Sequence, residues 1–144
     1  MLELFSSCNE KQKKIITEFS AFLSTEEKYQ KIITLGKTLS QKDDEIIKAE
    51  NIVPGCQSLI YLSSFVDNGT IIFKAYSEAL FSSGLAALLI SVYSEENPLA
   101  LLQCPPFFIE EIGLQNVISP SRSNGLQSLL LRMKQDALKA IIKK

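Results

Sequence analysis

A tight turn at Asn68-Gly69, between two apolar segments, limits the possible folds of this chain more than any other feature. Asn-Gly readily adopts the positive backbone φ angles that a two-residue hairpin turn requires. The flanking segments, 58–66 and 70–76, are rich in the β-branched and aromatic residues that favour strands. We therefore predict an antiparallel hairpin over about 57–76.

Helical patterns lie on both sides of this hairpin. Apolar residues recur at helical spacing, and the helices that they predict span residues 10–23, 24–39, 78–93, 95–102, 107–112 and 119–142. Helices that precede and follow a hairpin, instead of alternating with strands, are typical of the α+β class. We expect them to pack on a small antiparallel sheet. A third short strand at 51–53 would extend this sheet, because Pro54 favours extended geometry in the residue before it.

Several predicted helix ends carry residues that cap helices. Ser24, with Glu27 three residues later, forms a capping box. Asn9 and Ser77 occupy the capping position before the first helix and before the helix at 78–93. We expect Ser40 to begin the exit from the second helix, and the charged, weakly periodic segment 41–50 to form an exposed loop or a short turn of helix.

Length and charge restrict the class of protein. The 144 residues suit one domain over 1–144, and the formal net charge of −1 does not indicate a nucleic-acid-binding surface. The apolar run at 79–94 is interrupted by serines and a glycine, and it is shorter than the roughly 20 apolar residues that cross a bilayer. It therefore predicts a buried helix. Residues 1–8 lack the basic start and long apolar run of an export signal. We expect neither a nucleic acid nor a membrane as partner.

Histidine is absent from the chain. This excludes Ser-His-Asp and Cys-His catalysis and zinc sites with histidine ligands. The three cysteines, Cys8, Cys56 and Cys104, are widely spaced, odd in number and without a CxxC pair, so they do not indicate a disulfide framework. A reducing cytoplasm fits this usage. A metal site would require all three distant thiols to converge.

Cys56 is the first candidate for chemistry. It follows the turn residues Pro54-Gly55 and precedes a predicted strand, so a loop can present its thiol to a partner. Backbone N–H groups of the turn could stabilise a thiolate or persulfide anion there. Packing in the core is the equally weighted alternative. We expect Cys8 to lie in a frayed terminus without a role, and Cys104 to pack in a short turn. Either would act as a resolving thiol only if the fold brings it near Cys56.

Arg122, at the start of the last helix, is the second candidate. Arginine and a helix N-terminus both favour anions, but we favour a structural role in which Arg122 ties the helix start to carboxylates or carbonyls. Gly125 inside this helix indicates close packing against another element. The acidic clusters at 43–45 and 95–96 predict a solvated face.

A set of motifs in series carries a family resemblance. In chain order they are Glu27-Lys28-Tyr29, Ile32-Ile33-x-Leu35-Gly36, Val53-x-Gly55-Cys56-Gln57-Ser58, Ser77-Glu78-Ala79, Gly84-Leu85 and Ser119-Pro120-Ser121-Arg122-x-Asn124-Gly125-Leu126. Over about 24–137 they resemble the SufE family of sulfur-acceptor proteins. Gly-Cys-Gln-Ser alone is a weak motif, whereas the whole set in this order is specific.

The resemblance implies a SufE-like fold and a sulfur-transfer accessory protein whose partner is the enzyme. That partner would be a SufS-type cysteine desulfurase, which uses pyridoxal phosphate and leaves a persulfide on its own cysteine. Cys56 would accept the outer sulfur as a persulfide and thereby stimulate the desulfurase. It would then pass the sulfur to an iron–sulfur cluster scaffold of the SUF assembly system. The resemblance implies no cofactor or metal bound by this chain. In the family, the cysteine lies on a loop beside the sheet and can be sheltered by apolar side chains.

The chain departs from the family pattern at two positions. Tyr76 stands where an acidic residue often precedes the serine, and Cys104 stands where no thiol is expected. These departures concern loop mobility and partner contacts, not the role of Cys56. Arg122 and Gln57 match motif positions, but we assign neither a catalytic step.

Two other functions are compatible with parts of the sequence. An iron–sulfur or zinc-binding scaffold of related fold would bind stoichiometric metal through several clustered ligands. A thiol peroxidase would show a resolving cysteine or an activating motif, and its thiol would react with peroxide faster than free thiols. The sequence does not determine the oligomeric state, and a homodimer is among the options.

Overall fold

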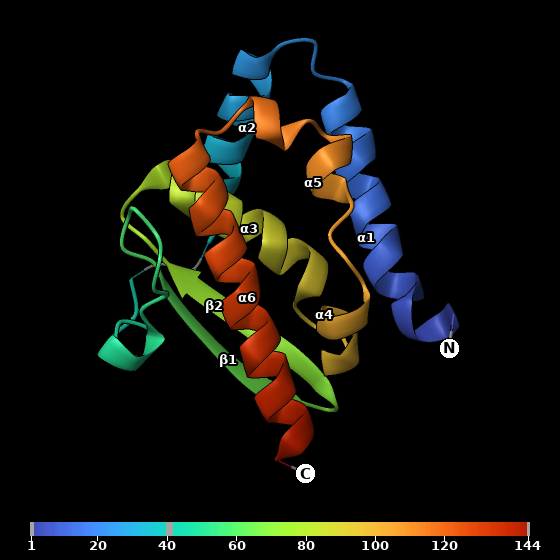
Figure 1. The fold of residues 1–144 in the computed structure, drawn as a ribbon, viewed down its shortest axis with the longest axis vertical. Helices are drawn as coiled ribbons and strands as arrows, with labels where there is room; N and C mark the ends of the chain where they lie inside the picture. Colours follow the sequence, from blue (N-terminus) through green and yellow to red (C-terminus); the bar gives the residue numbers. More distant parts are fainter. Residues whose placement is uncertain (1, 40–41, 144) are drawn as a thin grey trace.

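The predicted hairpin forms, and helices surround it (Figure 1). The computed structural model describes residues 2–39 and 42–143. Strands β1 (Tyr61–Asp67) and β2 (Thr70–Tyr76) pair antiparallel, with Asp67 opposite Thr70. Asn68 and Gly69 connect them with φ angles of 51° and 78°. Both central residues of the turn therefore have positive φ, as the Asn-Gly pair predicts.

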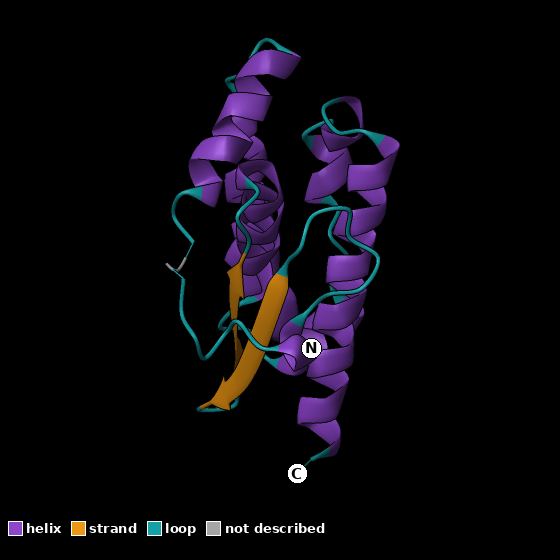
Figure 2. Cartoon of the chain, turned by 90° about the vertical axis from the view of Figure 1, so that its left-hand side faces the viewer, coloured by secondary structure: helices purple, strands orange, loops and turns teal. Residues whose placement is uncertain are grey.

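Six α-helices and two short 3₁₀ helices accompany the sheet in the described residues. They are α1 (Leu2–Ser20), α2 (Thr25–Gly36), η1 (Ala49–Asn51), α3 (Leu80–Tyr93), α4 (Pro98–Gln103), α5 (Phe108–Glu111), η2 (Leu114–Asn116) and α6 (Pro120–Ile142). Helix α3 lies in the middle, where it contacts β2, α1, α2 and α6. Seen from the side, the hairpin lies between loops and the helical layer (Figure 2). The predicted α+β class with helices on a small antiparallel sheet is confirmed.

Helix α3 is the buried helix that its apolar run predicts. Every residue from 81 to 89 is buried, including the two serines and the glycine that interrupt the run. Ser83 meets its hydrogen-bonding need by donating to the carbonyl of Ser77 at 2.9 Å. No helix in the described part of the chain is both long and apolar enough to span a membrane.

Helices α2 and α3 cross at two glycines. A Cβ on Gly36 would lie 2.5 Å from the Leu80 carbonyl oxygen and 2.8 Å from the Gly84 nitrogen. A Cβ on Gly84 would collide with the carbonyl oxygen of Ile32. The two backbones thus approach more closely than any side chain would allow, which explains both glycines on physical grounds.

Capping residues set the starts of several helices, as expected for Ser24. Ser24 accepts from the Glu27 N–H at 3.1 Å, while the Glu27 carboxylate accepts from the Leu23 N–H at 3.1 Å. Pro98 occupies the first turn of α4, and Ser119 caps α6 by accepting from the Arg122 N–H. The point at which the chain was predicted to leave the second helix, at residues 40–41, lies outside the described residues.

Three predicted helix starts are wrong. Helix α4 begins at Pro98 instead of residue 95. Helix α1 begins at Leu2, and Asn9 lies within it instead of capping it. The extra turns are held by Ser7, whose hydroxyl donates to the Glu96 carboxylate at 2.8 Å, and by Cys8, which is fully buried. Helix α3 begins at Leu80 instead of residue 78.

The predicted third strand reduces to a single bridge between Ile52 and Tyr61. Pro54 removes a backbone donor, and Gly55 turns the chain with a φ of 85°, so the ladder cannot continue. At the other edge, Ile71 pairs with Glu96 in a second isolated bridge. In the described part of the chain, the sheet therefore keeps two strands.

The crossing of α2 and α3 yields a stability prediction. Gly84→Ala forces a methyl group against the Ile32 backbone. Overpacking of this kind costs about 1–3 kcal/mol, and we expect the free energy of unfolding to fall by a value near the upper end of this range. Urea denaturation followed by circular dichroism measures it. Ser91→Ala, at an exposed position of the same helix, is the control and should change stability by less than about 0.5 kcal/mol. Equal effects of the two changes would contradict the role of the close approach.

Candidate functional site

Cys56 lies on a short loop that enters β1. The loop is closed at its base by the Val53 N–H, which donates to the Ile60 carbonyl at 2.9 Å. Gly55 adopts a positive φ, and a Cβ there would lie 2.5 Å from the Ser128 hydroxyl oxygen of α6. Glycine is therefore favoured by the positive φ of the turn, and it also leaves room for the Ser128 hydroxyl.

Helix α6 receives the Cys56 side chain at Gly125. The Cys56 thiol is half-buried and donates to the Gly125 carbonyl, with Sγ 3.6 Å from the oxygen. A Cβ built on Gly125 would lie 3.8 Å from Sγ, an ordinary van der Waals distance, so the thiol lies directly on the surface of the helix. The predicted close packing at Gly125 is confirmed, and its partner is the Cys56 loop.

A small cavity of about 20 Å³ opens beside this thiol. Its lining is mainly apolar or small and comes from the Cys56 loop, α3 and α6: Cys56, Gln57, Ser58, Ile60, Ser82, Leu85, Ser121, Arg122, Gly125, Leu126 and Leu129. A volume of this size admits about one water-sized atom. The site therefore shelters the thiol and leaves room for a single additional atom.

Burial raises the pKa of the Cys56 thiol above its usual range. The hydrogen bond to the Gly125 carbonyl acts in the same direction, because only the protonated thiol can donate it. The predicted stabilisation of a thiolate by backbone N–H groups is not what the geometry shows. At rest the side chain is held as a neutral thiol.

Arg122 lines the same cavity but is held by aromatic side chains. Its guanidinium lies 4.5 Å from the centroid of the Phe81 ring and donates to the Tyr29 hydroxyl at 3.5 Å. Tyr29 in turn stacks on Phe81 with centroids 4.5 Å apart. These contacts support the structural role predicted for Arg122, although they replace the expected carboxylates and carbonyls with aromatic partners. Its positive charge also stands at the wall of the cavity that contains Cys56.

Arg132 is a residue that sequence reasoning missed. Its guanidinium donates to the carbonyls of Glu50 at 2.7 Å and Ile52 at 3.1 Å, and it pairs with Asp136 at 3.4 Å. It therefore ties the start of the Cys56 loop to α6. The i,i+4 spacing of Arg132 and Asp136 is visible in the sequence. The contacts to carbonyls about 80 residues earlier have no sequence signal.

The other two cysteines lie together and away from the Cys56 cavity. Cys8 is fully buried in α1, and its Sγ is 2.8 Å from that of Cys104, which follows α4. The expectation that Cys8 lies in a frayed terminus is wrong, whereas the packing predicted for Cys104 is confirmed. Neither thiol lines the Cys56 cavity. All three cysteines are free, and in the described part of the chain no group of three or more Cys, Asp or Glu is placed to hold a metal ion.

The two acidic clusters behave differently. Asp43, Asp44 and Glu45 are exposed, as predicted. Glu96 is buried and forms an ion pair with Lys11 at 2.6 Å, which corrects the prediction of a solvated pair at 95–96. The reason is the backbone pairing of this segment with Ile71, which directs Glu96 inward.

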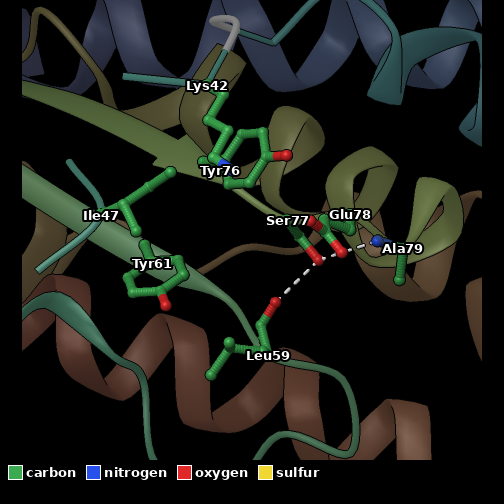
Figure 3. Close-up of a pocket in the computed structure, with 8 residues that line it drawn as sticks. All are labelled: Lys42, Ile47, Leu59, Tyr61, Tyr76, Ser77, Glu78 and Ala79. Atoms are coloured by element: carbon green, nitrogen blue, oxygen red, sulfur yellow. Dashed lines mark hydrogen bonds between the residues drawn. The ribbon is translucent and has the colours of Figure 1, made fainter. Parts of the chain in front are cut away.

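Ser77 links the hairpin to the Cys56 loop beside a larger, open pocket (Figure 3). Its hydroxyl donates to the Leu59 carbonyl at 2.8 Å and accepts from the Ala79 N–H at 3.2 Å. Ser77 thus caps the approach to α3, although Ala79 is the N-cap residue. The pocket has a volume of about 330 Å³ and is lined by Lys42, Ile47, Leu59, Tyr61, Tyr76, Ser77, Glu78 and Ala79. It contains no cysteine, so the reactive candidate lies in the smaller cavity.

Fold and site together define a small α+β protein that presents one half-buried thiol on a sheltered loop. Residues 13–137 match the model of the SufE family, described as an Fe-S metabolism associated domain. The chain belongs to the SufE family and has a role in iron–sulfur metabolism. The motifs that indicated this resemblance all lie within the matched residues.

Individual relatives agree with this assignment. The chain is 33% identical over 134 residues to SufE-like protein 1, chloroplastic/mitochondrial, of Arabidopsis thaliana, covering 92% of this chain but 36% of that protein. It is 31% identical over 125 residues to an uncharacterized SufE-like protein of Synechocystis, covering 87% and 79% of the two chains. The solution structure of a hypothetical protein from Thermus thermophilus superposes with a TM-score of 0.76 at 25% identity, covering 92% and 96%.

The environment of Cys56 predicts how its reactivity depends on pH. Alkylation requires the thiolate, so the rate at Cys56 should rise with pH and reach half its maximum at a higher pH in the folded protein than in the unfolded chain. Iodoacetamide labelling followed by peptide mass spectrometry measures Cys56 separately from the buried thiols. The same chain in guanidinium chloride is the control. A midpoint in the folded protein at or below the unfolded value would contradict the described environment.

Proposed function

We propose that this chain is a sulfur acceptor that carries one sulfur atom on Cys56 as a persulfide. The observation that supports this most directly is the half-buried Cys56 thiol beside a cavity for about one atom. Membership of the SufE family supports the same role. The sulfur donor would be a SufS-type cysteine desulfurase, whose pyridoxal phosphate releases the sulfur from cysteine onto the enzyme's own thiol.

The transfer step is a thiol exchange without net oxidation. The Cys56 thiolate attacks the outer sulfur of the donor persulfide, a new S–S bond forms at Cys56, and the bond to the donor cysteine breaks. The donor cysteine leaves as a thiolate, and the proton of Cys56 is released to solvent or to the partner. The absence of histidine from the chain is compatible with this chemistry, because the acceptor needs no general base of its own.

Because the pKa of Cys56 is raised, the partner must contribute to the activation of this thiol. The resting thiol donates to Gly125 and is mostly protonated, so the chain alone is a poor nucleophile. Docking must break this hydrogen bond and bring Cys56 out of its cavity toward a more polar or positively charged environment. Outside the complex the thiol stays sheltered and unreactive.

The same cavity protects the product. After transfer, the outer sulfur can occupy the small space that Leu85, Leu126 and Leu129 border. Apolar walls limit the access of reductants, which would otherwise release the sulfur. Emptying the donor cysteine would stimulate the desulfurase, and the carrier would then deliver its sulfur to an iron–sulfur cluster scaffold in a reducing compartment such as the cytoplasm.

The central test is the removal of the Cys56 sulfur. Cys56→Ser should leave the fold unchanged and abolish sulfur acceptance, because a hydroxyl cannot attack the donor persulfide. The wild-type chain, incubated with a SufS-type desulfurase and cysteine, should gain the mass of one sulfur atom in intact mass spectrometry. Peptide mapping should locate it at Cys56.

Cys8→Ala is the matched control for this test. It also removes one thiol, but from a buried position outside the Cys56 cavity, so this variant should still gain one sulfur atom. Sulfur bound by Cys56→Ser, or lost from Cys8→Ala with its fold intact, would contradict the proposal.

A further inference from the structure

The buried thiols of Cys8 and Cys104 form a second sulfur-containing site. Their Sγ atoms lie 2.8 Å apart, although the residues are separated by 96 positions in the chain. Both side chains are almost completely buried, with 0% and 4% exposure. Helix α1, which carries Cys8, and helix α4, which ends next to Cys104, lie at the opposite side of α3 from the loop that enters β1 (Figure 1).

A network of polar contacts holds the two thiols in place. Gln12, one turn after Cys8, donates to Cys104 Sγ at 3.4 Å and to the Pro105 carbonyl at 3.0 Å. The buried Tyr93 hydroxyl donates to the Cys104 carbonyl at 2.6 Å. The Cys104 thiol also lies 3.3 Å from the Asn9 side-chain oxygen. The position of the pair is therefore set from α1, from α3 and from the chain after α4.

The geometry of the Cys8 and Cys104 pair favours a disulfide bond over the binding of a metal ion. In the described part of the chain, no third Cys, Asp or Glu joins these two thiols in a metal-binding group. A disulfide has an S–S length of about 2.05 Å. The two sulfurs thus need to approach each other by less than one ångström, which side-chain rotation and a small shift of α1 can supply.

Burial, and then the neighbouring Cys104 and Glu96, raise the pKa of the Cys8 thiol well above its usual range. Cys8 therefore rests as a thiol and reacts slowly while α1 stays docked. Reaction requires α1 to open, or it takes place before α1 docks. This burial distinguishes the pair from the half-buried Cys56.

We propose that Cys8 and Cys104 are a site of reversible disulfide formation that joins α1 to the end of α4. The oxidant is a low-molecular-weight disulfide. One thiolate attacks a sulfur of this oxidant and releases one thiol, and the second cysteine then attacks the mixed disulfide and releases the other. Two protein thiols are oxidised by two electrons in total, and one oxidant disulfide is reduced to two thiols.

The bond would fix α1 without involving Cys56. It closes a loop that contains most of the chain, so it restricts the unfolded state and stabilises the fold. Cys56 stays the one remaining thiol of the three. The inference does not depend on the proposed sulfur transfer, because neither Cys8 nor Cys104 lines the Cys56 cavity.

Refolding in a glutathione redox buffer tests the proposal. The full chain is refolded from urea at a series of ratios of oxidised to reduced glutathione, quenched with N-ethylmaleimide and measured by intact mass spectrometry. With rising oxidised glutathione, we expect the number of alkylated thiols to fall from three to one. Peptide mapping without reduction should find Cys8 linked to Cys104. The oxidised form should melt at a higher temperature than the reduced form.

Three variants make the result specific. Cys56→Ser should lose both of its thiols to the same bond, which separates this test from that of sulfur transfer. Cys8→Ala and Cys104→Ala should each keep two alkylated thiols and show no rise in melting temperature. The proposal is overturned if all three wild-type thiols stay alkylated at every ratio, if the bond involves Cys56, or if only glutathione adducts form at Cys8 and Cys104.

Discussion

The close contact between α2 and α3 is the constraint on which the site depends. Because Gly36 and Gly84 let the two backbones meet, α3 is held deep in the protein and its position leaves little freedom. Helix α3 then supplies Ser82 and Leu85 to the wall of the Cys56 cavity, and Phe81 to the support of Arg122. The crossing of α2 and α3 therefore determines the shape of the cavity beside Cys56.

The reactivity of Cys56 is set by its loop and by α6 together. Gly55 supplies the positive φ of the loop and leaves room for the Ser128 hydroxyl, and Gly125 offers a bare helix surface that lies in ordinary van der Waals contact with Cys56. The outcome is a thiol that is partly buried and hydrogen-bonded to a carbonyl, which favours its neutral form. Arg132 fastens the beginning of the same loop to α6. Reactivity is thus controlled by access more than by a nearby charge.

Features encoded by neighbouring residues could be predicted from the sequence, and features made by tertiary contact could not. The Asn68-Gly69 turn and the cap at Ser24 depend on local backbone geometry, and both were predicted. Cys56 was found because turn residues precede it. The burial of Cys8 and Glu96 arises from contacts with segments about 90 residues away. The local pattern, polar around Cys8 and charged around Glu96, indicated exposure, and only packing reverses it.

The size of the cavity at Cys56 has a consequence for the cargo. Under the proposed function, a space of about 20 Å³ shelters about one outer sulfur, and any further sulfur atom would extend beyond its apolar walls. A longer chain of sulfur atoms on Cys56 would therefore be exposed to reductants. Each carrier molecule would then deliver one sheltered sulfur atom, so the amount of sulfur delivered would equal the number of carrier molecules that dock.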